Sequence, residues 1–215
     1  MRLKNFFREN GYRAVKLIVV HIAVSIFALS IYLPFNTTPT GSKTQHFLAL
    51  ILGIFSIIFY FFMIYGQMWE VGAKDELKIV NGKKKAYMGK GFLIGLVAAI
   101  PDFIICFAYV IFWFFQSYEW AANGYYLLKL GTVFWEGMFM GVNTVLLNDS
   151  PYMFIFVPFV TVLFAGISYI FGMKNIRLMP MEDNPEEEER RREMKKLKKE
   201  KKQKGDADDD DDELI

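Results

Sequence analysis

Lysine and arginine are grouped between long apolar runs, and this grouping limits the possible folds more than any other feature. Five basic residues lie in the first 16 positions, six in residues 67–91 and twelve after Gly172, whereas residues 36–46 carry only Lys43. Basic residues next to membrane-spanning segments are enriched on the cytoplasmic side. The pattern therefore predicts a multi-pass membrane protein whose N- and C-termini and central basic loop lie together in the cytoplasm.

The amino-acid composition is typical of a membrane protein. Hydrophobic residues make up 53% of the 215 positions, including 22 Phe, 11 Tyr and 11 Met, which is more than a soluble chain of this length buries. One cysteine excludes an internal disulfide, and with only two histidines we expect neither a Cys/His metal cluster nor a cofactor. We predict a plasma-membrane location and no binding to nucleic acid.

Four apolar segments are long enough to cross a bilayer as helices, which takes about 20 residues. They are residues 15–34, 47–66, 92–116 and 152–172. Residues 125–147 form a fifth apolar segment, but it carries Lys129 and Glu136. If it crossed, either the basic tail or both the basic N-terminus and the central loop would lie outside, against the usual charge distribution.

We therefore predict an all-α fold, a polytopic membrane helix bundle with four transmembrane helices. Residues 125–147 would be one helix on the outer face, either lying in the interface or entering the membrane as a re-entrant segment. Residues 1–178 make up this bundle, and residues 179–215 a charged cytoplasmic tail. In the tail, capping signals predict a helix at about 185–204, and the acidic run at 206–213 predicts disorder.

Asp102 is the one acidic residue within the four predicted spans. It lies about ten residues into the third span, near the middle of the membrane, where an ionisable group is costly and marks a functional site by default. The alternative is structural: Pro101 and Asp102 would start a helix after a break, with the carboxylate near free backbone N–H groups.

Other polar residues are candidates for a cavity around Asp102. Lys129, Glu136 and Asn143 recur at intervals of seven, so a continuous helix would present them on one face. This stripe predicts either a solvated face of an interfacial helix or the rim of a cavity that faces Asp102. His21, about one turn inside the cytoplasmic end of the first span, would be either a packed, hydrogen-bonded side chain or a proton carrier.

Two charged segments are candidates for contacts with partners. The basic loop at 74–90 is predicted to contact anionic lipid of the bilayer. The charged tail is predicted to be a solvated segment that contacts a cytoplasmic protein partner. Cys106 lies in the third span, where a thiol has no reason to ionise, so we expect no reactivity there.

A further set of positions supports a family resemblance. The set comprises Trp69, Glu70, Gly72, Lys74, Asp75, Gly89, Gly91, Gly95, Ile100, Pro101, Gly166, Tyr169 and Gly172. In these positions the chain resembles uncharacterised multi-span membrane proteins of low-GC Gram-positive bacteria, over most of residues 45–178. The resemblance implies a plasma-membrane setting and assigns no activity.

Two functions remain open. The first is a non-enzymatic scaffold or accessory membrane subunit that acts through the tail and the basic loop. The second is a small transporter or membrane-embedded binding subunit that uses Asp102 and the polar stripe. We expect no enzyme activity, because no protease motif, Ser/His pair or pair of acids is found in the predicted spans.

Overall fold

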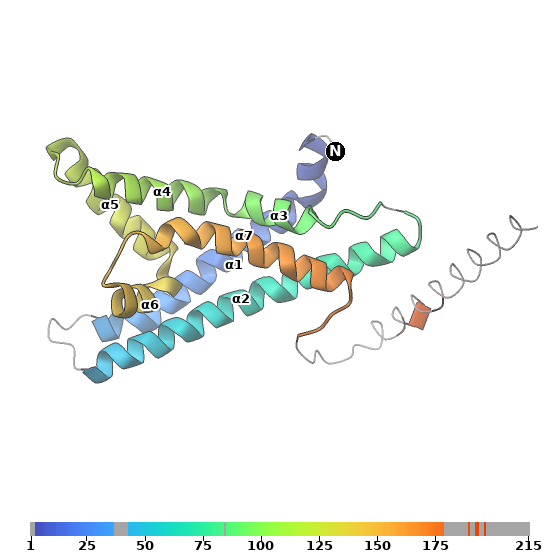
Figure 1. Cartoon of the computed structure of the whole chain (residues 1–215), viewed down its shortest axis with the longest axis horizontal. Coiled ribbons are helices and arrows are strands. Elements are labelled where there is room, and N and C mark those ends of the chain that lie inside the picture. Colours follow the sequence, from blue (N-terminus) through green and yellow to red (C-terminus); the bar gives the residue numbers. More distant parts are fainter. Residues whose placement is uncertain are drawn as a thin grey trace, which may run out of the picture.

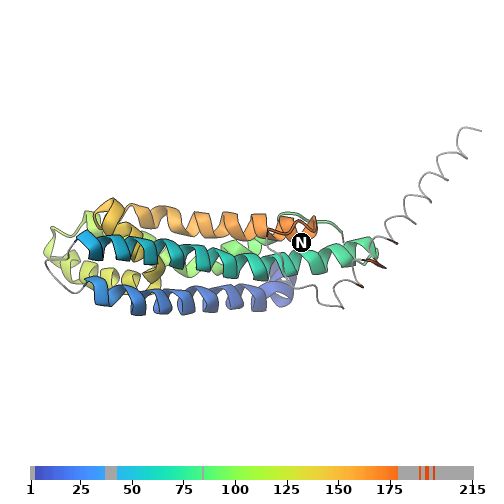
Figure 2. The ribbon, with the colours of Figure 1, turned by 90° about the horizontal axis from the view of Figure 1, so that it is seen from below.

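The computed structural model describes residues 3–36, 43–83 and 85–178, together with Glu189, Arg192, Glu193 and Lys196. Within these residues the chain forms seven helices and no strand, which confirms the all-α class. The helices are α1 (Leu3–Asn36), α2 (Lys43–Val80), α3 (Lys90–Ala98), α4 (Ile100–Phe114), α5 (Glu119–Trp135), α6 (Gly137–Leu147) and α7 (Met153–Met173). They form one elongated bundle in which α2 packs against both α1 and α7 (Figure 1 and Figure 2).

Three helices are long and apolar enough to cross a membrane by themselves: α1 over Phe6–Pro34, α2 and α7. Two further candidates are bent helix pairs, because α3 and α4 meet at 51° and α5 and α6 at 110°. The described chain thus has three to five candidate membrane-spanning helices. α1 and α2 extend well beyond the predicted segments 15–34 and 47–66, since hydropathy marks only the apolar part of a helix.

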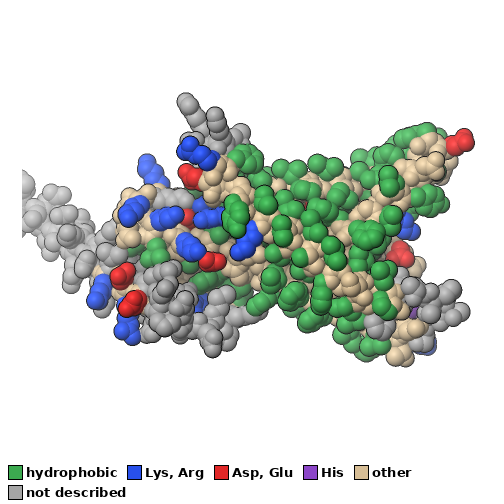
Figure 3. Space-filling model, turned by 180° about the vertical axis from the view of Figure 1, so that it is seen from behind, with side chains coloured by type: hydrophobic (Ala, Val, Ile, Leu, Met, Phe, Trp, Pro, Cys, Tyr) green, Lys and Arg blue, Asp and Glu red, His purple; other side chains and the backbone are tan. Residues whose placement is uncertain are grey.

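Apolar side chains cover the middle of the molecule, and basic side chains gather at one end (Figure 3). Ile58 on α2, Ile104 on α4 and Phe156 on α7 are 61%, 65% and 66% exposed. A contiguous apolar surface of this kind is unfavourable in water and favourable in lipid. The long apolar helices are therefore those of a membrane protein.

A break at Ala99 separates α3 from α4, as Pro101 predicts. Proline has no amide N–H for the preceding turn and its ring crowds that turn, so the helix bends. α3 itself lies directly on α7. A Cβ atom added to Gly91 would lie 2.4 Å from Tyr169 Cβ, a separation that leaves room for glycine only.

The structure differs from the predicted single helix at 125–147. α5 and α6 are separated by Glu136, which has the non-helical angles φ −105° and ψ 27°. Because the bend is 110°, the chain turns back on itself at this residue. Lys129 and Asn143 therefore belong to two helices of different direction, and the predicted single polar face does not exist.

Contacts with α1 explain this break. The end of a helix leaves carbonyl groups without partners, and the carbonyl oxygen of Trp135 accepts hydrogen bonds from His21 Nε2 (2.9 Å) and from the Ser25 hydroxyl. The first residue of α6, Gly137, lies so close to α1 that an added Cβ would be 2.4 Å from Leu29 Cγ. Tertiary contacts with α1 thus satisfy the end of α5 and accompany the start of α6 at Gly137.

Both outer ends of the α5–α6 pair lie at the same end of the bundle (Figure 1). α5 follows α4 after a short turn, and near the end of α6 the Thr144 hydroxyl hydrogen-bonds the Tyr32 hydroxyl of α1 at 2.7 Å. In between, Trp135 meets His21 near the middle of α1. The pair therefore reaches to the middle of the bundle and returns.

Most of the predicted tail at 179–215 lies outside the described residues, as do nearly all of the helix predicted at about 185–204 and the whole acidic run at 206–213. Only Glu189, Arg192, Glu193 and Lys196 of the tail are described, and each has helical conformation. The predicted boundary of the tail and its disorder stay predictions.

Candidate functional site

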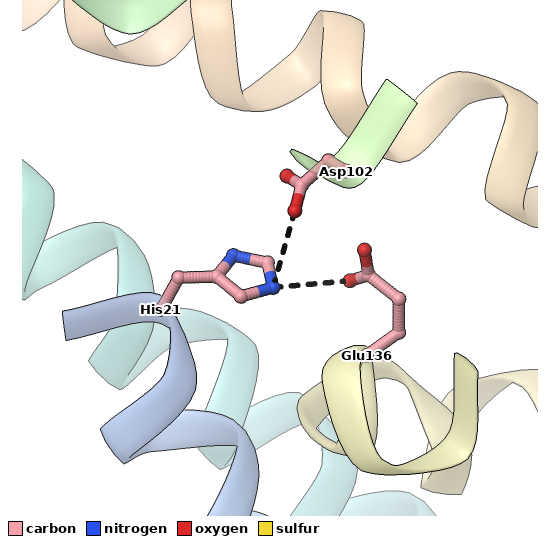
Figure 4. A group of neighbouring side chains, drawn as sticks. All are labelled: His21, Asp102 and Glu136. Carbon is pink, nitrogen blue, oxygen red and sulfur yellow. Dashed lines mark ion pairs between the residues drawn. The ribbon is translucent and has the colours of Figure 1, made fainter. Parts of the chain in front are cut away.

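Three ionisable side chains from distant parts of the sequence meet in the middle of the bundle (Figure 4). His21 lies on α1, Asp102 in the first turn of α4 and Glu136 at the break between α5 and α6. His21 Nε2 is 3.5 Å from Asp102 Oδ1 and 3.7 Å from Glu136 Oε2. The side chains are nearly sealed from solvent, with residue exposures of 4%, 2% and 0%. We call these three residues the central triad.

His21 lies beside Asp102, although the sequence predicted different depths for the two residues. It predicted His21 about one turn inside the cytoplasmic end of the first span and Asp102 near the middle of the membrane. Because the two side chains are in contact, they lie at one level of the bundle. Their depth in the membrane stays a prediction.

The imidazole of His21 has two further polar contacts. Its Nδ1 is hydrogen-bonded to the Tyr60 hydroxyl of α2 at 2.9 Å, and Nε2 to the Trp135 carbonyl at the same distance. The Tyr60 hydroxyl also lies 3.4 Å from Thr161 Oγ1 of α7. The ring is thus held in one orientation, with Nε2 directed at the two carboxylates, as a packed, hydrogen-bonded histidine should be.

The two carboxylates have different partners. Asp102 lies in the first turn of α4, as the structural alternative requires, but its Oδ1 also accepts a hydrogen bond from the Trp135 indole N–H and faces His21. Glu136 Oε1 accepts from the Cys106 thiol at 3.4 Å. Glu136 Oε2 is buried and has no hydrogen-bond partner among the described residues.

The central triad would have an excess of negative charge with both carboxylates ionised. Asp102 and Glu136 would then carry two negative charges, and His21 supplies at most one positive charge, so either a proton or another cation is needed for balance. Within the described part of the chain, no Lys or Arg forms an ion pair with either carboxylate. A buried charge costs several kcal/mol unless it is compensated. The arrangement therefore favours the uptake of a cation.

A pocket of about 200 Å³ opens between α1, α4, α5, α6 and α7, and no residue of the triad lines it. Lys129 and Asp149 line it together with the more deeply placed Thr132 and Asn143. Thr132 Oγ1 and Asn143 Oδ1 are buried and have no hydrogen-bond partner among the described residues. Because Thr132 is one helical turn before Glu136, the lining of this outer pocket comes within one turn of the triad along α5.

The five residues of the predicted polar cavity thus fall into two groups. His21, Asp102 and Glu136 form the central triad, whereas Lys129 and Asn143 line the outer pocket. The sequence showed no pair of acids in the predicted spans because Glu136 lies outside them. In the structure, however, Glu136 lies beside Asp102 in the middle of the bundle.

No sequence pattern indicated the aromatic residues around the triad. Tyr60 and Trp135 lie within apolar runs of a chain that is 17% aromatic, so their contacts with His21 have no pattern that would single them out. Cys106 is different. It lies one helical turn after Asp102, and that spacing places both side chains on one face of α4.

A second group of buried polar residues lies toward the basic end. Lys90 Nζ is 2.6 Å from Asp75 Oδ2, and the Tyr169 hydroxyl donates to the same oxygen at 3.0 Å. All three side chains are buried. Lys90 was predicted to contact anionic lipid with the rest of loop 74–90, but it is instead a buried bridge between α3 and α2.

Comparisons with protein-family models, with curated proteins and with solved structures gave no match. The family resemblance stays a prediction from sequence.

Proposed function

We propose that α1, α2, the α3–α4 pair and α7 cross the plasma membrane and that α5–α6 is a re-entrant pair entering from the outer side. The gathering of Lys and Arg at one end supports a cytoplasmic location of that end and of both termini. The return of α5–α6 to the opposite end supports four spans rather than five. Backbone that is not helical at membrane depth is tolerated where it is buried in protein, and Glu136 is fully buried.

The function that this geometry supports best is cation binding and transport by a small non-enzymatic membrane protein. The observation that carries it is the convergence of two buried carboxylates and one histidine at two helix breaks, next to an outer pocket. Secondary transporters place their ion and substrate sites near the bilayer midplane, where spanning helices are interrupted. The central triad would be the binding site and the outer pocket its entrance.

The size of the outer pocket supports an ion over a larger substrate. Pockets for drug-sized ligands enclose at least about 300 Å³, whereas this one has about 200 Å³.

Reconstitution into proteoliposomes tests the transport proposal. Wild-type protein should carry cations into vesicles loaded with ion-sensitive dyes for H⁺, Na⁺ and divalent metals, and Asp102→Asn and Glu136→Gln should each lower the rate at least tenfold. Glu70→Gln is the matched control, because Glu70 is an exposed acid that pairs with Lys74 far from the triad. Equal rates for wild type and both triad variants would contradict the proposal.

An accessory role at the cytoplasmic face is a second candidate, supported by a pocket of about 160 Å³ between α1 and α2. Arg13, Lys16 and Lys74 line it, and Arg13 Nη1 is buried without a hydrogen-bond partner among the described residues. Such a pocket suits an anionic lipid headgroup. If removal of residues 181–215 and Arg13→Gln together left all bound lipid and co-purifying protein unchanged, this accessory role would be excluded.

A further inference from the structure

We infer that His21, Asp102 and Glu136 are the protein ligands of a divalent transition-metal ion of the Zn²⁺ type. The inference rests on the proposed function, because it names the class of cation that the central triad takes. Three elements of the fold each supply one ligand: α1 the imidazole, α4 one carboxylate and the α5–α6 break the other. The three ligand atoms lie within 4.8 Å of one another.

The spacing of these atoms is close to that of a filled site. Two ligands held about 2.1 Å from one ion at a tetrahedral angle lie about 3.4 Å apart. The distances from His21 Nε2 to the Asp102 and Glu136 oxygens are 3.5 and 3.7 Å. Both distances from the imidazole nitrogen are therefore within a few tenths of an ångström of the separation expected in a filled site.

Each ligand also has a partner outside the site, as metal ligands usually do. His21 Nδ1 contacts the Tyr60 hydroxyl, so Nδ1–H donates to it when Nε2 binds the ion. Asp102 accepts from the Trp135 indole N–H. If Nε2 turns from the Trp135 carbonyl to the ion, the Ser25 hydroxyl still donates to that carbonyl.

The Glu136 carboxylate supplies the most direct support for a metal ion at this site. Its Oε1 accepts from the Cys106 thiol, while Oε2 is fully buried, faces His21 and has no hydrogen-bond partner among the described residues. A buried carboxylate oxygen without a partner is costly. A metal ion bonded to Oε2 removes that cost.

Charge and donor type select the ion. A neutral imidazole and two carboxylates balance a divalent cation, which matters in a site sealed from water. One nitrogen and two carboxylate oxygens suit Zn²⁺ or a neighbouring transition metal, whereas Ca²⁺ takes six to eight oxygen ligands. Three protein ligands leave a fourth position open, as in exchangeable sites and unlike closed structural ones.

Metal titration of the purified full-length chain tests the inference. After removal of any affinity tag and dialysis against a chelator, wild-type protein in nanodiscs should bind one Zn²⁺ per chain. Co²⁺ should give a visible d–d absorption that Zn²⁺ abolishes and that Ca²⁺ and Mg²⁺ leave unchanged. His21→Gln and Glu136→Gln should each weaken binding at least 100-fold. His46→Gln, which changes the other histidine, on the exposed surface of α2, should bind as wild type.

Tyr60→Phe provides a variant that keeps all three ligands. It removes only the Tyr60 hydroxyl that contacts His21 Nδ1 and should weaken binding about tenfold, with unchanged helical circular dichroism.

Two results would overturn the inference. One is failure of wild type to bind Zn²⁺ or Co²⁺, and the other is binding that His21→Gln, Glu136→Gln and Tyr60→Phe all leave unchanged. Transport of H⁺ or Na⁺ that depends on Asp102, without metal binding, would overturn the metal site and leave the transport proposal standing. Metal binding at the triad without any transport would overturn the transport proposal and leave the metal site standing.

Discussion

Glu136 combines three properties that rarely occur together in one side chain. It is fully buried, it interrupts a helix, and one of its carboxylate oxygens has no hydrogen-bond partner among the described residues. A residue kept for packing alone would be apolar here, since replacement of buried charges by neutral groups is often stabilising. The carboxylate therefore needs a functional reason, and cation binding supplies one.

Substitution of Glu136 should have opposite effects without and with metal. In chelator, Glu136→Gln should raise the stability of the protein by about 1 kcal/mol, because a neutral amide costs less to bury than a carboxylate. With Zn²⁺ at 100 times the wild-type Kd, wild type should gain about 2.7 kcal/mol and the variant at most about 0.4 kcal/mol. Thermal unfolding in detergent, followed by circular dichroism, measures both. The same shift with Zn²⁺ in both proteins would contradict the assignment.

Trp135 should stabilise the site through its indole N–H, which donates to Asp102. Trp135→Phe keeps an aromatic ring and removes that donor, so it should cost about 1–3 kcal/mol, the usual penalty for an unsatisfied buried group. Trp120→Phe is the control, because Trp120 is 68% exposed. Denaturant unfolding compares the two variants, and an equal loss in both would exclude a role for this hydrogen bond.

At the level of single elements, glycine positions determine how closely α2 and α7 pack. A Cβ on Gly72 would lie 2.1 Å from the Tyr169 carbonyl oxygen, whereas one on Gly66 of the same helix has no neighbour within 4 Å. Gly72→Ala should therefore destabilise the protein by about 1–3 kcal/mol through overpacking. Gly66→Ala should stabilise it by up to about 1 kcal/mol through helix propensity. Thermal midpoints that move in the same direction would contradict this packing.

The helices themselves could be predicted from sequence, but not the break at Glu136. Apolar runs predicted all the long helices. Pro101 predicted the bend between α3 and α4, because proline acts through its own backbone. Glu136 is followed by no proline, and the seven-residue spacing of Lys129, Glu136 and Asn143 indicated one continuous helix. The break depends on His21 and Ser25 of α1, more than 100 positions away in the sequence, which no local pattern reports.

For the same reason, the sequence predicted the members of the site but not their arrangement. Asp102 stood out because a charge within an apolar run is costly. Its meeting with His21 and Glu136 required the packing of α1 beside α4 and the return of the α5–α6 pair, both of which are tertiary features. Lys129 and Asn143 were placed on the same face as Glu136 and instead line the neighbouring pocket.

For the whole molecule, the re-entrant pair predicts which loops are accessible from which side. In a Cys106→Ala background, single cysteines at Ser117 and Leu147, which flank α5–α6, should both react with an impermeant maleimide added outside intact cells. A cysteine at Lys85, in the exposed basic loop, should react only after permeabilisation. Reaction of the two flanking positions from opposite sides of the membrane would instead require five spans.

Metal binding by the central triad is tested most directly by X-ray absorption at the zinc edge on the purified, Zn²⁺-loaded chain. We expect one zinc per chain with only nitrogen and oxygen neighbours at about 2.0–2.2 Å, and loss of that signal in Asp102→Asn. A sulfur neighbour at about 2.3 Å, or a zinc load and spectrum unchanged by Asp102→Asn, would contradict it.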